Sequence, residues 1–167
     1  PDPSPETVHS APPAGTWDQF RRLLLQHQLG PEGTGSLYAV IQCRISGACQ
    51  LQDDELLATL LQVIAANPRN ARLHTMYANV AWNILGDRDL AVRMQREAVA
   101  LSGNSSSARL GLAEFLLASG EPGAIAEGRE LLESIRRGPK GGRISSALSA
   151  LDARYPPPPP TFDERSP

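Results

Sequence analysis

The sequence predicts an all-α protein, and three observations support this prediction. Leu and Ala dominate the apolar residues and β-branched runs are few, which favours packed helices over sheets. Apolar side chains recur at three- and four-residue spacing through most of the chain. No segment shows the apolar–polar alternation of a half-buried strand. We therefore expect helices to be the regular secondary structure of this protein.

Glycine, proline and asparagine separate the expected helices. In the first, Trp17, Phe20 and Leu24 form one stripe, and Thr16 stands at the N-cap position. The stretch "GPEGTG" is expected to break the chain before the second helix, and acidic residues begin the third, where the helix dipole favours them. The predicted helices are 17–29, 36–43, 53–67, 70–85, 88–101, 106–119, 124–137 and 143–154.

Proline-rich segments flank the helical part, which we expect to span 17–154. Residues 1–16 hold five prolines without a helical period, which indicates a disordered or extended linker. Residues 155–167 contain five consecutive prolines, which favour a polyproline II segment, either a spacer or a ligand for an aromatic groove. The linker lacks the features of a signal peptide, so we expect the domain to be cut from a larger protein, with the missing part on the N-terminal side.

Two glycine–acid pairs, Gly86-Asp87 and Gly120-Glu121, stand 34 residues apart, each between two predicted helices. Residues of contrasting size occur where paired helices would approach each other. On the first helices these are Tyr77-Ala78 and Leu112-Ala113, and on the second helices the small residues are Ala91, Ala98 and Ala126.

This pattern resembles the tetratricopeptide repeat (TPR), a pair of helices with a 34-residue period. The resemblance implies best repeats at about 70–103 and 104–137 and a degenerate one at about 36–69, closed by Pro68. It thus implies a right-handed stack of antiparallel helix pairs with about two to three repeats. The alternative is an unrelated helical bundle with coincidental spacing.

The predicted array has caps and departs from the repeat pattern at two places. The helix at 143–154 presents Ile144, Leu148 and Leu151 on one face and fits a capping helix, and the helix at 17–29 would cap the other end. The closing proline of the best repeat is replaced by Gly103, and the turn "GEPGAIAEG" is interpreted as carrying an inserted residue.

The resemblance also implies a groove, because the first helices of such repeats line a concave surface that usually binds peptides. Arg72, Asn79 and Asn83 share one stripe of the first helix, and Arg109 would face a similar direction in the next repeat. Arginine can bind a carboxylate through two hydrogen bonds, and asparagine can hold a peptide backbone. We predict that these four residues bind a protein or peptide partner. An ordinary solvated helix face is the alternative.

The two cysteines, Cys43 and Cys49, flank "RISGA", a segment that can fold back on itself. We predict a disulfide between them, which would stabilise the fold by roughly 2–3 kcal/mol and imply an oxidising compartment. Of the sixteen basic residues only Lys140 is lysine, which is typical of a GC-rich, bacterial genome or of selection for arginine. The predicted location is therefore the periplasm. Two free thiols in a cytoplasmic protein are the alternative.

Several other functions find little support in the sequence. The net charge of -2 gives no strong field for nucleic acid or anionic lipid, and no apolar run approaches the roughly 20 residues that cross a bilayer. His9, His27 and His74 do not cluster, and no metal, phosphate-loop or nucleophile motif is present. We expect no cofactor, no metal and no catalytic residues.

Two classes of function remain, besides an enzyme in its own right. The first is a non-catalytic scaffolding module that recruits or positions a protein partner. The second follows from the region 67–91, which is faintly similar to the soluble C-terminal helical tails of bacterial polytopic membrane proteins, including glycosyltransferase-like and glycan-polymerase-like ones. That resemblance implies a periplasmic accessory domain, tethered through a missing N-terminal region.

Overall fold

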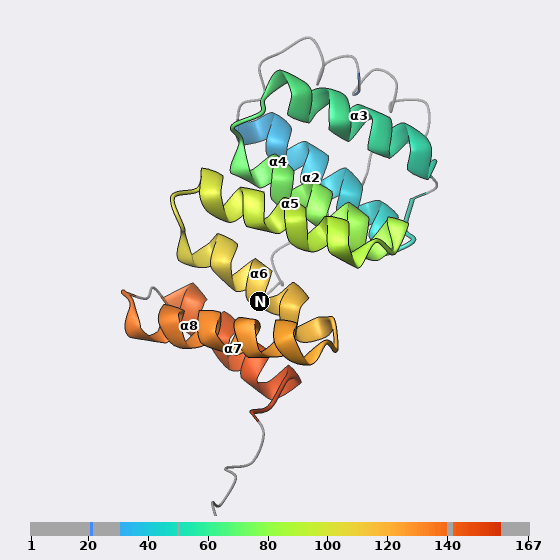
Figure 1. Ribbon diagram of the computed structural model, residues 1–167. Coiled ribbons are helices and arrows are strands. Elements are labelled where there is room, and N and C mark those ends of the chain that lie inside the picture. The colour runs from blue at the N-terminus through green and yellow to red at the C-terminus, as the bar shows by residue number, and fades with distance from the viewer. Residues whose placement is uncertain (1–20, 22–30, 50, 140–141, 158–167) are drawn as a thin grey trace, which may run out of the picture. The chain divides into compact units, whose positions relative to one another are not determined.

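The computed structural model describes residues 21, 31–49, 51–139 and 142–157, and the regular secondary structure of these residues is entirely helical (Figure 1). The predicted all-α class is confirmed for this part of the chain. The chain forms two compact units, Pro1–Asn104 and Ser105–Pro167. The elements are α2 (Pro31–Ile45), α3 (Asp53–Ala66), α4 (Ala71–Val80), the π-helix η2 (Ala81–Leu85), α5 (Arg88–Leu101), α6 (Ser106–Ala118), α7 (Pro122–Arg137) and α8 (Gly142–Arg154).

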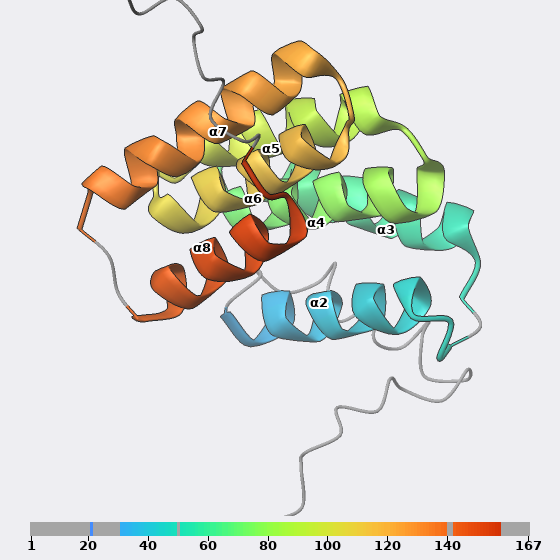
Figure 2. The same ribbon diagram turned by 90° about the horizontal axis from the view of Figure 1, so that it is seen from below.

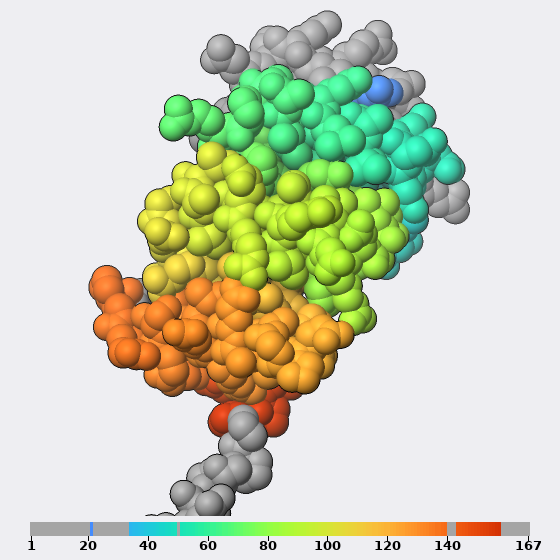
Figure 3. Space-filling view, in the orientation of Figure 1, coloured from blue at the N-terminus to red at the C-terminus, as the bar shows by residue number. Residues whose placement is uncertain are grey.

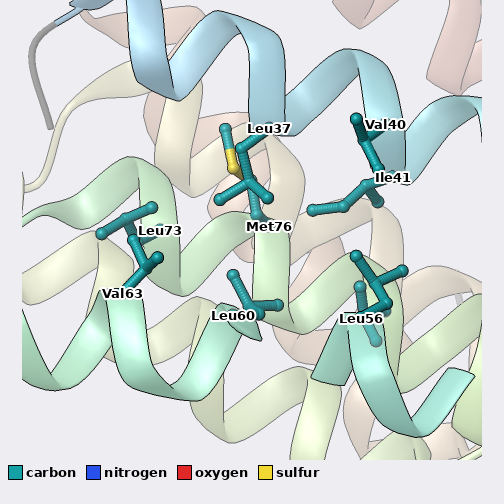
Figure 4. Packing of buried hydrophobic residues seen from close by; sticks show 9 residues of the cluster. Leu37, Val40, Ile41, Leu56, Leu60, Val63, Leu73 and Met76 are labelled. Carbon is teal, nitrogen blue, oxygen red and sulfur yellow. The ribbon is translucent and has the colours of Figure 1, made fainter. Parts of the chain in front are cut away.

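The core of the first unit is formed by one face each of α2, α3 and α4 (Figure 4). Each helix contributes three buried apolar residues at helical spacing, so that the nine side chains form one cluster. Burial of a single Leu or Ile contributes about 1.5–3 kcal/mol, so this cluster is the main force that holds the three helices together. Its members are Leu37, Val40, Ile41, Leu56, Leu60, Val63, Leu73, Met76 and Val80.

Helix α5 packs along α4 and η2 through small residues. Ala91 and Ala98 are fully buried, as are Ala78 and Ala81 on the other side of the helix pair. Side chains of this size let two helix backbones approach closely, as the sequence predicts for Ala91 and Ala98. The opposite side of α5 lies at the surface (yellow-green in Figure 3) and carries the exposed Arg88, Asp89, Arg93, Arg96 and Glu97.

The turns at Gly86 and Gly120 have the same backbone design. Both glycines have left-handed φ angles, +68° and +79°, which an L side chain rarely adopts. The next residue in each case, Asp87 or Glu121, is the N-cap of the second helix. The Asp87 carboxylate accepts a hydrogen bond from Leu90 N at 2.9 Å and thereby satisfies one of the free N–H groups of the first turn. The 34-residue spacing of these turns therefore corresponds to matching local structure.

The first helices of the two pairs differ in length by one residue. Between the N-cap Asn70 and Gly86 lie 15 residues, 71–85, whereas 14 residues, 106–119, lie between the N-cap Ser105 and Gly120. The extra residue coincides with η2, where the Gly86 N–H reaches back five residues to Ala81 O. A π turn holds one more residue than an α turn, so η2 absorbs the insertion without moving the glycine turn.

The second unit combines α6, α7 and α8 around its own core. The buried members of this core are Ala113, Leu117, Leu132, Ile135, Leu148 and Leu151. Helices α6 and α7 approach each other closely at Gly128. An added Cβ there would lie 3.1 Å from Leu117 Cγ, 3.2 Å from the Ala113 carbonyl oxygen and 3.3 Å from Leu116 Cβ. Gly128 therefore permits the close packing of this helix pair.

Helix α8 covers the apolar side of the α6–α7 pair (Figure 2). Leu148 and Leu151 are buried and Ile144 packs against the same core, which confirms their predicted common face. Polar contacts at the edge fix the position of α8. Arg136 of α7 binds both carboxylate oxygens of Asp152, and Arg154 donates to Glu114 Oε1 of α6 at 2.7 Å.

A third arginine holds the chain where α8 ends. Arg129 of α7 donates to the carbonyl oxygens of Tyr155 and Pro156, the latter at 2.8 Å. The proline run therefore begins at a position that α7 fixes.

Several predicted boundaries are wrong. Helix α2 begins at Pro31 instead of residue 36, so residues 31–35 of the expected break are helical, and α7 begins at Pro122 instead of residue 124. Proline is well suited to the first helical position, because its φ angle is preset and the missing N–H would lack a helical partner there. The inserted residue predicted in the second turn does not exist, since α7 follows Gly120-Glu121 as directly as α5 follows Gly86-Asp87.

One predicted contact residue is also wrong, and some predictions cannot be compared. Ala126 is exposed, and the small residue at the helix contact is Gly128. The other five predicted helices agree within one residue at each end, if α4 and η2 are taken together. The linker 1–16, the helix 17–29 apart from the helical Arg21, and most of the tail 155–167 lie outside the described residues.

We predict that Gly128→Leu lowers the free energy of unfolding by about 1–3 kcal/mol, because the new side chain would overpack the contact with α6. Gly123→Leu, in the same helix, is the matched control, since an added Cβ there meets nothing within 4 Å. Both substitutions replace glycine by a better helix former, so the difference reports packing. Chemical denaturation followed by circular dichroism measures it. Equal stabilities of the two variants would contradict a close α6–α7 contact.

Candidate functional site

The predicted binding residues of the first unit lie along α4 and η2. Arg72 is exposed in the first turn of α4, Asn79 is half-buried near the end of α4, and Asn83 is exposed in η2. The intervening Met76 is not part of this surface, because it is buried in the core. The structure therefore gives the first unit a polar strip of Arg72, Asn79 and Asn83.

Hydrogen bonds to the helix backbone hold the two asparagines of this strip. Asn79 Nδ2 donates to Thr75 O at 3.0 Å, and Asn83 Nδ2 donates to Asn79 O at 2.9 Å. The second bond runs from η2 back to the last turn of α4. At this point the backbone hydrogen-bond pattern changes from the α to the π spacing. Each amide nitrogen thus has one hydrogen engaged, and the side-chain carbonyl oxygen is the natural group for a partner.

Arg109, the fourth predicted residue, belongs to the second unit. It is half-buried on α6, and its backbone N–H donates to Ser105 O at 3.0 Å. Glu114, one turn further along α6, pairs with Arg154 of α8. A continuous surface formed by Arg109 together with Arg72, Asn79 and Asn83 stays a prediction.

An aromatic–cation pair at the Gly86 turn was missed in the sequence. The guanidinium of Arg88 lies 5.2 Å from the ring centroid of Trp82, across the Gly86 turn. Close by in the chain, Leu85 is 40% exposed at the end of η2. Tryptophan and arginine are enriched at the centres of protein interfaces. The six-residue separation of Trp82 and Arg88 spans a turn, so helical periodicity does not reveal their contact.

His74 has a structural role. It is buried on α4, and its Nε2 lies 2.9 Å from Pro68 O, so this nitrogen carries the proton and donates to the loop before α4. His9 and His27 lie outside the described residues. Within the described ranges, no group of three or more His, Cys, Asp or Glu residues is placed to bind a metal ion.

The two cysteines are free thiols held side by side at the end of α2. The loop folds back so that Cys43 O accepts hydrogen bonds from Ala48 N at 3.0 Å and Cys49 N at 3.4 Å. An ion pair between Arg44 and Asp53, at 2.7 Å, links the two helices that flank this loop. The disulfide stays a prediction, and the loop conformation brings its two partners together.

The environment of Cys49 favours the neutral thiol. Burial raises the pKa of Cys49 from 9.0 to about 11. The hydrogen bond with the Cys43 thiol and the charge of Cys43 contribute to this increase, while the positive charge of Arg44 lowers the pKa. Because the folded state prefers the protonated thiol, Cys49 contributes its full stabilisation of the fold below pH 9. This stabilisation is lost as the pH rises from about 9 to about 11.

Comparisons with known proteins gave no match. No protein-family model, curated protein or solved structure matches it. None of the described helices is long and apolar enough to span a membrane.

We predict that alkylation of Cys49 in the reduced protein accelerates about tenfold per pH unit up to about pH 11, because the thiolate is the reactive form. In urea the rate should level off near pH 9. Iodoacetamide labelling followed by peptide mass spectrometry measures both profiles, and a folded-state profile that levels near pH 9 would contradict the raised pKa. The same labelling without reductant, on protein from an oxidising compartment, tests the disulfide, since labelling of both thiols there would exclude it.

Proposed function

We propose that this protein is a non-catalytic helical-repeat module of TPR type that binds a protein or peptide partner through the α4–η2 surface. One observation carries the proposal: polar Arg72, Asn79 and Asn83 share a helix face, and Trp82 of the same segment contacts Arg88. Tryptophan and arginine are enriched at the centres of protein interfaces, so a segment that carries them with hydrogen-bonding groups suits the binding of a partner.

The construction of the helix pairs supports the repeat part of the proposal. Each pair has a left-handed glycine turn, an N-cap residue after the turn and small residues at the contact between its helices. Repeats of this kind present their first helices to ligands, and α4 with η2 is the first helix of the better-matching pair. A short extended segment or a C-terminal carboxylate suits the strip, because Arg72 can bind a carboxylate and the asparagine carbonyls can accept backbone N–H groups.

The second candidate is an accessory domain in the periplasm, attached to a membrane-embedded glycosyltransferase or glycan polymerase. The juxtaposed Cys43 and Cys49 favour this candidate, since a disulfide would indicate an oxidising compartment. The gene sequence upstream of Pro1 separates the candidates. A series of apolar segments would support the accessory domain, whereas a soluble upstream region would support the free-standing module.

We predict that the double variant Arg72→Ala/Asn79→Ala loses at least about tenfold in partner capture, because removal of central interface contacts typically costs more than 1 kcal/mol each. The control Arg93→Ala/Glu97→Ala changes two exposed residues of α5 away from the strip. Quantitative pull-down from extract of the source organism compares the variants, after circular dichroism shows that both are folded. Equal capture of every partner by both variants and the wild type would exclude this surface as the binding site.

A further inference from the structure

The reduced cysteine pair is a preformed arrangement of two sulfur ligands. Cys43 lies in the last turn of α2, and its carbonyl accepts hydrogen bonds from Ala48 N, Cys49 N and Ser46 Oγ, the last at 3.0 Å. Gly47, with φ of +74°, allows the chain to fold back at this point. The Cys49 thiol is consequently a hydrogen-bond partner of the Cys43 thiol, and both residues are only half-buried. A ligand can reach two sulfurs whose backbone positions are already fixed.

We propose that the reduced Cys43–Cys49 pair binds one Cu(I) ion through two thiolates. Soft thiolate ligands favour soft metal ions, of which Cu(I) and zinc are the relevant single ions. Binding replaces two S–H protons by two Cu–S bonds, releases both protons to solvent and leaves the oxidation states of copper and sulfur unchanged. The metal charge stabilises the thiolates, so a thiol that stays protonated in the free protein can still be a ligand.

Cu(I) fits this site better than zinc, because the described residues offer only two protein ligands here. Structural zinc requires four protein ligands in a tetrahedron, and the described residues hold no cluster of three or more candidate ligands. Two sulfurs are sufficient for a monovalent d¹⁰ ion that accepts two-coordinate geometry. The site therefore fits a soft monovalent cation better than a divalent one.

The charge of the resulting complex also fits its surroundings. Two thiolates and one monovalent cation leave one negative charge, and Arg44 is within electrostatic reach of the Cys49 sulfur. The Arg44 guanidinium also pairs with Asp53. This ion pair weakens the field of Arg44 at the sulfurs but holds its side chain at the loop. A neighbouring cation stabilises an anionic complex and would repel a positively charged one.

The test is an anaerobic titration of the reduced full chain with Cu(I) against a colorimetric Cu(I) chelator. We expect one Cu(I) per chain and binding at least about 100-fold weaker in Cys43→Ser, which keeps one thiol. Gly47→Val retains both thiols but strains the turn, and it should weaken binding about tenfold if the preformed loop matters. Arg44→Gln should weaken it a few-fold, as expected of an exposed charge, whereas Arg93→Gln on α5 should not.

Binding by Cys43→Ser as tight as that of the wild type would overturn the proposal, and so would one Cu(I) shared between two chains in sedimentation experiments. If Cys43→Ser fails to fold, X-ray absorption of the wild-type complex decides instead. Two sulfur neighbours support the site, and additional sulfur or nitrogen ligands exclude it. The titration uses reduced protein, so its outcome is independent of the disulfide and of partner binding.

Discussion

In each unit, two helices joined by a left-handed glycine run so close together that the contact accommodates only small residues. Ala91 and Ala98 provide this contact in α5, and Gly128 provides it in α7. The remaining apolar side chains are buried by further helices: α2 and α3 pack on α4 in the first unit, and α8 packs on α6 and α7 in the second. Dense packing of this kind tolerates little change in side-chain volume.

The same constraint explains where the polar strip lies and why η2 exists. Because the glycine turn and the small contact residues fix the second helix of the pair, an extra residue in the first helix has to be accommodated within that helix. The π turn does so at Ala81–Leu85, and Asn83 donates to Asn79 O beside it. Wide turns of this type occur frequently at functional sites. Asn83 of the strip, Trp82 and the exposed Leu85 all lie within this irregularity.

Helical periodicity and caps predicted the all-α class and most of the described helices, because these signals are local. The starts at Pro31 and Pro122 were missed, since a proline was interpreted as a break although it can equally open a helix. The sequence contained a discrepancy that only the structure explains: Tyr77 and Leu112 are 35 residues apart, whereas Gly86 and Gly120 are 34 apart. The π turn accounts for this difference, and the extra residue was wrongly placed in the second turn.

The candidate site was harder to predict than the fold. Helical spacing placed Arg72, Asn79 and Asn83 on one strip, but it did not show that both amides bond to their own helix. The Trp82–Arg88 contact depends on the path of a turn, and the meeting of Cys43 with Cys49 depends on the φ angle of Gly47. Such contacts depend on tertiary geometry, which residue spacing along a helix does not reveal.

Deletion of single residues tests most directly whether η2 absorbs one inserted residue in an otherwise standard helix pair. Deleting Asn83 should convert η2 to an ordinary α turn, and we expect the unfolding of the first unit to stay cooperative, with a free energy within about 1 kcal/mol of the wild type. Deleting Gly111 from the regular α6 should instead rotate one part of that helix by about 100° and disrupt the second core. Hydrogen exchange with mass spectrometry follows both units separately. Loss of protection throughout the first unit after the Asn83 deletion, as severe as the loss in the second unit after the Gly111 deletion, would contradict the account.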